Sequence, residues 1–172
     1  GAVELASVRK IKAVEYSFAP FAPAKASKSA DDKEQAYLSS VRELAAEKDV
    51  EFACLNLDFC LDAGDKKSVK QFLPMLEKLG QVAQASACKK VSFHLRPQAE
   101  DDWLQSFVQH YPTLRDSLGA LGVAPLLRLS TPVQYRGLSL KKWRALDPQE
   151  WRDLLSSCEG LGLIYSPADC VW

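Results

Sequence analysis

The sequence has no excess of charge of either sign, because 22 Lys and Arg side chains balance 22 Asp and Glu side chains over 172 residues. Proteins that bind nucleic acid through its phosphates normally carry an excess of basic residues, so nucleic acid is not an expected partner. No apolar run approaches the roughly 20 residues that cross a bilayer, and the chain does not start with a charged segment followed by an apolar one. We therefore expect no membrane partner and a cytoplasmic location, unless a signal peptide lies upstream of Gly1.

Short motifs that identify a reaction are also missing. The five cysteines contain no CxxC pair and no zinc-ligand spacing, which predicts reduced structural thiols. There is no glycine-rich phosphate loop, no Ser-His-Asp order and no nucleotide fingerprint. The function must therefore be sought in the fold and in single polar residues.

Five short apolar or β-branched runs recur along the chain, and patterns typical of amphipathic helices separate them. The runs cover residues 11–17, 50–57, 90–95, 123–129 and 161–165. They are almost continuously apolar, as in parallel strands that are covered by helices. The sequence thus predicts a single α/β domain over residues 1–172, in which parallel strands alternate with helices.

Four helices are expected between these strands. The last has the clearest start, with Asp147 as the cap, Pro148 at the first helical position and Glu150 three residues after the cap. Pro74 is expected to kink or delay the second helix, and Pro112 to interrupt the third. Gly122 is expected to close that third helix.

Several segments together resemble the sugar phosphate isomerase/epimerase family, whose members have a xylose-isomerase-like TIM barrel. The segments, in chain order, are IKAVEYSF, YLSSVRELAAEKDVEFACLNLDF, FLPMLEKLGQVAQASACKKVSFHL, LRDSLGALGVAPLLR and LIYSPADCVW. The resemblance matches the five runs to the second through sixth strands of a barrel that has eight strands in about 250 residues. It implies a fragment of a longer protein or an incomplete (β/α) TIM barrel of about five strand–helix units. In an incomplete barrel, open edges predict a homo-oligomer.

The resemblance also implies a divalent cation (Mn, Zn or Mg) held by carboxylates and histidine at the strand ends. At the matching positions this sequence has Arg128, Ser166 and Asp169. A guanidinium is effectively never deprotonated, so Arg128 places a fixed positive charge where a cation is expected. No metal cofactor is therefore expected, unless other residues have rebuilt the site.

Polar residues remain at the expected mouth of the sheet. His94 is the strongest site candidate, since it is one of two histidines and stands at the carboxyl end of a strand. His94 and Glu15 are the candidate catalytic residues. The ligand-binding candidates are His94, Arg96, Asp58, Arg128 and Asp169. For Glu15 and Arg128 a buried ion pair is the competing interpretation, and His110 is expected at the surface.

Two hypotheses for function remain open. The chain is either a diverged sugar phosphate isomerase/epimerase homologue that acts on a small sugar or sugar phosphate, or a noncatalytic binding or assembly module built on a degenerate TIM barrel. The missing ligands favour the second hypothesis, and the family resemblance favours the first.

Overall fold

The computed structural model describes residues 2–18, 28–62, 66–96, 103–128 and 147–164. Within these ranges, helices and strands alternate from end to end. The elements are α1 (Ala2–Val8), β1 (Ala13–Phe18), α2 (Lys28–Glu47), β2 (Glu51–Asp62), α3 (Lys66–Ala85), β3 (Lys90–Arg96), α4 (Trp103–Ala120), β4 (Ala124–Arg128), α5 (Pro148–Ser157) and β5 (Gly162–Ile164). None of the described helices is long and apolar enough to cross a membrane.

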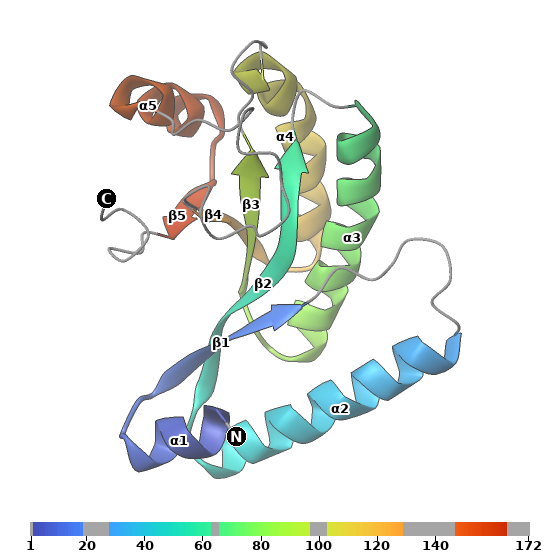
Figure 1. Ribbon diagram of the computed structural model, residues 1–172, viewed down its shortest axis with the longest axis vertical. Coiled ribbons are helices and arrows are strands. Elements are labelled where there is room, and N and C mark those ends of the chain that lie inside the picture. The colour runs from blue at the N-terminus through green and yellow to red at the C-terminus, as the bar shows by residue number, and fades with distance from the viewer. Residues whose placement is uncertain (1, 19–27, 63–65, 97–102, 129–146, 165–172) are drawn as a thin grey trace.

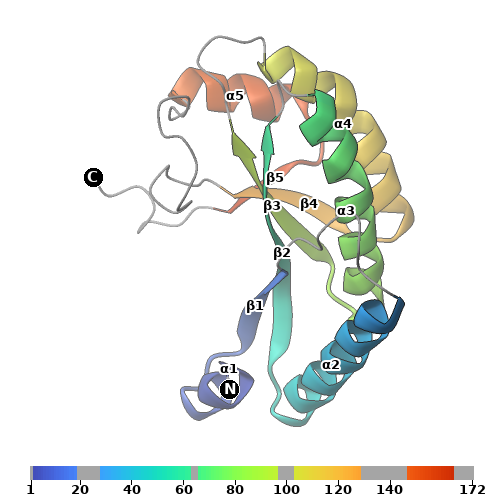
Figure 2. The ribbon, with the colours of Figure 1, turned by 45° about the vertical axis from the view of Figure 1, so that its right-hand side comes forward.

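The strands form one curved sheet in chain order, β1-β2-β3-β4-β5, and every neighbouring pair is parallel (Figure 1). Helices α2, α3 and α4 follow the curve along one side of the sheet (Figure 2). Each strand therefore pairs with the next strand in sequence after a helical crossover. This is the winding of a (β/α) barrel, and it confirms the predicted class of parallel strands alternating with helices.

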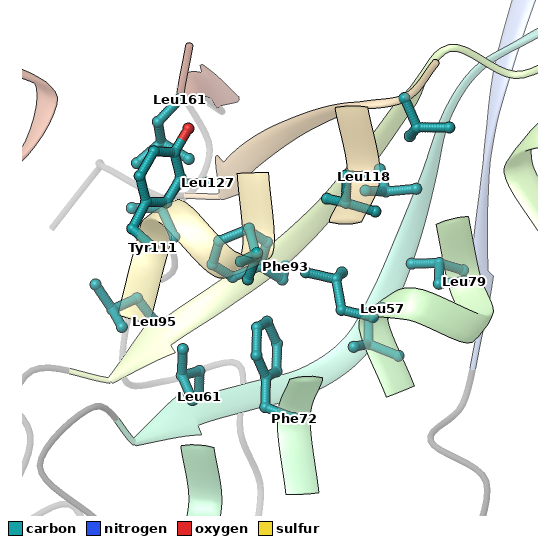
Figure 3. Close-up of a cluster of buried hydrophobic side chains, with 14 of the residues drawn as sticks. Leu57, Leu61, Phe72, Leu79, Phe93, Leu95, Tyr111, Leu118, Leu127 and Leu161 are labelled. Carbon is teal, nitrogen blue, oxygen red and sulfur yellow. The ribbon is translucent and has the colours of Figure 1, made fainter. Parts of the chain in front are cut away.

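The main core lies between the sheet and helices α3, α4 and α5 (Figure 3). Every second residue of a strand points to this side, as Val91, Phe93 and Leu95 do in β3. Phe93 is fully buried and its ring packs edge-on against Phe72 of α3, with 5.1 Å between the ring centroids. Trp103 of α4 is also buried in this core.

The prediction that Pro112 interrupts its helix was wrong, because α4 runs through Pro112 without a break. Helix α3 likewise begins before Pro74 and runs through it, so Pro74 does not delay that helix. A proline in a helix removes one hydrogen bond to the carbonyl four residues earlier. Pro74 and Pro112 are both exposed, so water can hydrate the carbonyl that each leaves free. The lost hydrogen bond is therefore on the solvent-facing side of each helix, and the buried faces of α3 and α4 keep their packing.

Two further features differ from the sequence prediction. Helix α1 was not predicted, yet its Val3 and Ala6 are buried against Ala45 of α2 in a small second core. Strand β2 continues to Asp62, so Asp58 lies within the strand and does not end it. A register irregularity between Asn56 and Cys60 accompanies this extension. A charged residue after an apolar run marks a strand end poorly when the strand has a polar face.

The helix ends follow the local sequence closely. The predicted capping box of α5 is present, with the Asp147 carboxylate accepting from the backbone of Gln149 and Glu150. Gly122 has a positive φ of 71° after the end of α4, and Val123 N donates to Leu118 O at 3.0 Å. This is the Schellman pattern, in which glycine avoids the strain that a side chain would bring.

Candidate functional site

The face of the sheet opposite the main core, called here the inner face, carries most of the polar strand residues. The alternation of β2 and β3 assigns Asn56, Ser92 and His94 to it, because their neighbours in sequence are core residues. All three are at most 5% exposed. Buried polar side chains normally have hydrogen-bond partners, and for Asn56 and Ser92 these partners lie on the neighbouring strands.

A chain of side-chain hydrogen bonds crosses three strands of the inner face. Ser92 Oγ of β3 donates to Asn56 Oδ1 of β2 at 2.9 Å, and Asn56 Nδ2 donates to Ser17 Oγ of β1 at 2.9 Å. The backbone register places these residues side by side, since Ser17 pairs with Asn56 and Asn56 with Ser92. Asn56 is thereby fixed in orientation. Ser17, Asn56 and Ser92 form a hydrogen-bonded row across the inner face, and Ser17 is its exposed end.

An ion pair between Glu15 and Arg128 lies on the same face. Arg128 Nη2 of β4 donates to Glu15 Oε1 of β1, so the contact crosses the two strands that stand between them in the sheet. The Arg128 side chain is 17% exposed and the Glu15 side chain 35%. Within the described residues, Arg128 Nε is buried and has no hydrogen-bond acceptor. One edge of the guanidinium is therefore only half used.

Cys54 of β2 lies close to this ion pair. The register pairs it with Glu15, and its thiol is within electrostatic range of both Glu15 and Arg128. Burial raises the pKa of Cys54 to about 11, and a hydrogen bond with Ser92 only partly opposes that shift. The thiol is therefore neutral at ordinary pH and adds no charge to the inner face.

His94 takes its place beside Arg128. The two residues are register partners on β3 and β4, and His94 is 5% exposed. Its position near the carboxyl end of β3 agrees with the sequence prediction, but its burial means that a ligand would meet the edge of the ring at most. His94 therefore packs beside the candidate site, and its side chain is not exposed to a ligand.

The structure thus brings together three of the predicted site residues: Glu15, His94 and Arg128 share the inner face. The side chains of Asp58 and Arg96, and the whole of Asp169, lie outside the described residues. His110 is exposed on α4, as expected, with its Nδ1 2.7 Å from Ser106 O.

Sequence reasoning missed the hydrogen-bonded row and Cys54. The signal was present as single polar residues between apolar ones, in LNL around Asn56 and VSF around Ser92. In a strand that is covered on one face by helices, such a residue must point to the other face.

No family model and no curated protein sequence matches this chain. Solved structures do match its fold. The xylose isomerase domain protein from Planctomyces limnophilus aligns with 97% of this chain and 57% of its own, with a TM-score of 0.69 and 11% identity. The D-psicose 3-epimerase from Clostridium cellulolyticum H10, solved with D-tagatose, aligns over 94% and 55%, with a TM-score of 0.67 and 10% identity. The IOLI protein with a bound zinc atom aligns over 94% and 55%, with a TM-score of 0.67 and 13% identity.

The fold is that of a xylose isomerase-like TIM barrel. This chain spans little more than half the length of the solved structures, so it is a partial barrel of that type. The identities are low, and the likeness therefore concerns the fold alone.

The described residues of the inner face do not assemble the ligands of the divalent cation that the family resemblance implies. Nowhere in the described ranges do three or more His, Cys, Asp and Glu side chains gather closely enough to hold a metal ion. At the β4 position where a carboxylate ligand is expected, the Arg128 guanidinium already binds the Glu15 carboxylate. A metal ion there would meet a fixed positive charge and would compete with it for the same carboxylate.

Proposed function

We propose that this chain is a diverged sugar isomerase- or epimerase-like barrel that binds a small sugar or sugar phosphate on its inner face and lacks the usual metal-dependent catalysis. The Glu15–Arg128 ion pair is the observation that carries this proposal. It neutralises one carboxylate and places a permanent cation at the carboxyl end of β4, the end of the strands at which barrel sites lie.

The strength of the ion pair supports a site without metal. With one partner at 17% exposure and the other at 35%, the pair is neither fully solvated nor fully buried. Two unit charges about 4 Å apart attract each other by about 4 kcal/mol at an effective dielectric constant of 20, and desolvation together with screening at the partly open Glu15 carboxylate reduces this to a net of about 1 kcal/mol. A metal that recruits Glu15 would have to overcome this attraction and also leave Arg128 without its partner.

The row of Ser17, Asn56 and Ser92 supports a polyhydroxylated ligand. Hydroxyl and amide groups donate and accept in fixed directions, as sugar recognition requires. Asn56 is buried and held at both ends of its amide, so it fixes Ser17 Oγ, the exposed end of the row, without further ordering. Fixed polar groups bind a ligand at a lower entropic cost than mobile ones.

Sugar binding by the full chain tests this proposal. We expect ketoses, aldoses and their phosphates, screened by thermal unfolding, to include compounds that raise the melting temperature, and raise it further as the logarithm of their concentration increases. Asn56→Leu should abolish that effect, because it removes the hydrogen bond that holds the exposed Ser17 hydroxyl in place. Gln84→Leu is the control, since Gln84 is an exposed amide on α3 that donates to Leu121 O, away from the inner face. A sugar that stabilises wild type and Asn56→Leu equally would contradict binding on the inner face.

The noncatalytic binding or assembly module is the second candidate, and the same ion pair favours it. If Glu15 and Arg128 only join β1 to β4 within the sheet, their removal lowers stability and no sugar is bound. The two candidates therefore differ in the ligand screen, while both predict that the ion pair contributes to folding.

A further inference from the structure

We propose that the ligand of the inner face is a sugar acid, whose carboxylate binds the Nε–Nη2 edge of Arg128 in place of Glu15. This inference rests on the proposed function, because it names the class of sugar that the same face would take. Glu15 is then an internal competitor that holds Arg128 until the ligand arrives.

The first argument is the half-used edge of the guanidinium. Nη2 and Nε point the same way in the plane of the group and together match the two oxygens of one carboxylate. Glu15 Oε1 accepts a hydrogen bond from Arg128 Nη2, whereas Arg128 Nε is buried without an acceptor in the described part of the chain. A carboxylate placed squarely on this edge satisfies both donors. The present pair leaves one of them unsatisfied.

The second argument is the difference in exposure between the two partners. Glu15 is 35% exposed and Arg128 is 17% exposed. If the pair opens, the Glu15 carboxylate can turn to water, while the guanidinium remains held in the sheet beside His94. Glu15 is therefore the partner that can leave, and its departure frees the Nε–Nη2 edge of Arg128 for another anion.

The third argument is the balance of charge. A carboxylate that replaces Glu15 on Arg128 exchanges one negative charge for another. A phosphate ester brings a charge of about −1.5 to −2 at neutral pH and would leave part of it uncompensated. Cys54, the nearest thiol, stays neutral in this range because burial raises its pKa. These charges favour a carboxylate over a phosphate.

The hydrogen-bonded row supplies the rest of the recognition. Ser92 contacts Cys54, which in turn lies within electrostatic range of Arg128, so the row begins beside the guanidinium. From Ser92 it continues through Asn56 to Ser17 on β1. Ser92 and Asn56 are buried and hold Ser17 Oγ, which is exposed, so a ligand with a carboxylate at one end and a hydroxyl that reaches Ser17 matches this arrangement.

Three probes test the inference by isothermal titration calorimetry: D-glucuronate, D-glucose and D-glucose 6-phosphate. Glucuronate and glucose differ only at C6, where one has a carboxylate and the other a hydroxymethyl group. We expect glucuronate to bind the wild-type chain at least tenfold more tightly than glucose, and more tightly than glucose 6-phosphate. Glucose binding as tight as glucuronate binding, or glucose 6-phosphate binding that is tighter, overturns the inference.

Two variants separate ligand binding from a purely structural ion pair. Glu15→Gln keeps the shape of the side chain but removes the competing charge, and should tighten glucuronate binding about fivefold. Arg128→Lys keeps the charge but removes the two-donor edge, and should weaken glucuronate binding at least tenfold. Unchanged or weaker glucuronate binding by Glu15→Gln overturns the competition. If Arg128→Lys does not fold, as shown by circular dichroism, Glu15→Gln and the three probes still decide the question.

The same data distinguish this inference from the proposed function. Sugars that bind through Asn56 without preference for the carboxylate leave the proposed function standing and remove the inference. If neither wild type nor Glu15→Gln binds any of the three probes, and the wider sugar screen is also negative, both are overturned.

Discussion

Arg128 and Glu15 are 113 positions apart in the chain, yet their side chains meet on the inner face and connect β4 to β1. The contact spans β2 and β3, so it depends on the curvature of the sheet and not on pairing between adjacent strands. It therefore reports on whether the partial barrel is correctly curved.

A double-mutant cycle measures this contact. Glu15→Gln, Arg128→Met and the combined variant should give a coupling energy of about 1 kcal/mol. About a third of the Glu15 side chain is exposed, and the water that reaches it screens the attraction between the two charges. The measurement is urea unfolding followed by circular dichroism. A coupling energy indistinguishable from zero would mean that the two side chains do not meet in solution.

The core between the sheet and the helices should dominate stability. Leu127→Ala removes a side chain that is fully buried, and we expect a loss of about 2–5 kcal/mol in the free energy of unfolding. Leu5→Ala is the matched control, since Leu5 is 60% exposed and the same substitution there should change stability by less than about 0.5 kcal/mol. Equal effects at both positions would contradict the described packing.

Two residues with a positive φ, each just after a helix, lead to substitutions that should change stability in opposite directions. Ala87 follows α3 with a positive φ of 55°, and Gly122 follows α4 with a positive φ of 71°. Ala87→Gly should stabilise the chain and Gly122→Ala should destabilise it, each by about 0.5–1 kcal/mol, because side chains are strained in this region. A Cβ at position 122 would meet no atom within 4 Å, so backbone strain alone is tested there. Thermal unfolding gives both values, and changes of the same sign would refute the assignment.

The thiol of Cys54 should be slow to react and should titrate late. Its pKa is raised to about 11 from the ordinary 9.0, so at pH 8 its thiolate fraction is about 100-fold smaller than that of an ordinary thiol. In the folded chain, alkylation by iodoacetamide, followed by peptide mass spectrometry, should rise about tenfold per pH unit from pH 8 to pH 10. Thiols in a urea-unfolded sample provide the control, and their rate should rise only about twofold between pH 9 and pH 10, because they are already half ionised at pH 9. A rate for Cys54 that also rises only about twofold over that interval would show that the thiol is not buried in solution.

The sign of the same shift fixes its effect on stability. Between pH 9 and pH 11 the unfolded chain loses the Cys54 proton, while the folded chain retains it. The unfolded state then binds fewer protons, so this group lowers the free energy of unfolding as the pH rises through that window.

Much of the fold could be predicted from local sequence. Strand positions followed from apolar runs, and the start of α5 followed from Asp147, Pro148 and Glu150, because capping depends on residues only two or three positions apart. The effect of Pro112 could not be predicted in the same way. Its cost depends on whether the carbonyl that it frees faces water, and that is decided by how α4 packs.

The candidate site could be predicted only as a set of residues. The strand-end rule selected His94 and the family resemblance selected Arg128, but they gave neither the burial of His94 nor the direction in which Arg128 points. Those depend on the curvature and register of the whole sheet. The irregularities in β2 at its pairings with β1 and β3 shift that register, and local patterns do not reveal them.

The most direct test of a site without metal is a titration of the purified chain with Mn²⁺ and Zn²⁺ after treatment with a chelator, followed by calorimetry. Because Arg128 stands where a ligand carboxylate is expected and already binds Glu15, we predict no stoichiometric uptake of either ion by the wild-type chain. Tight binding of one ion per chain, lost in Glu15→Gln, would show that Glu15 is a metal ligand and would contradict the account.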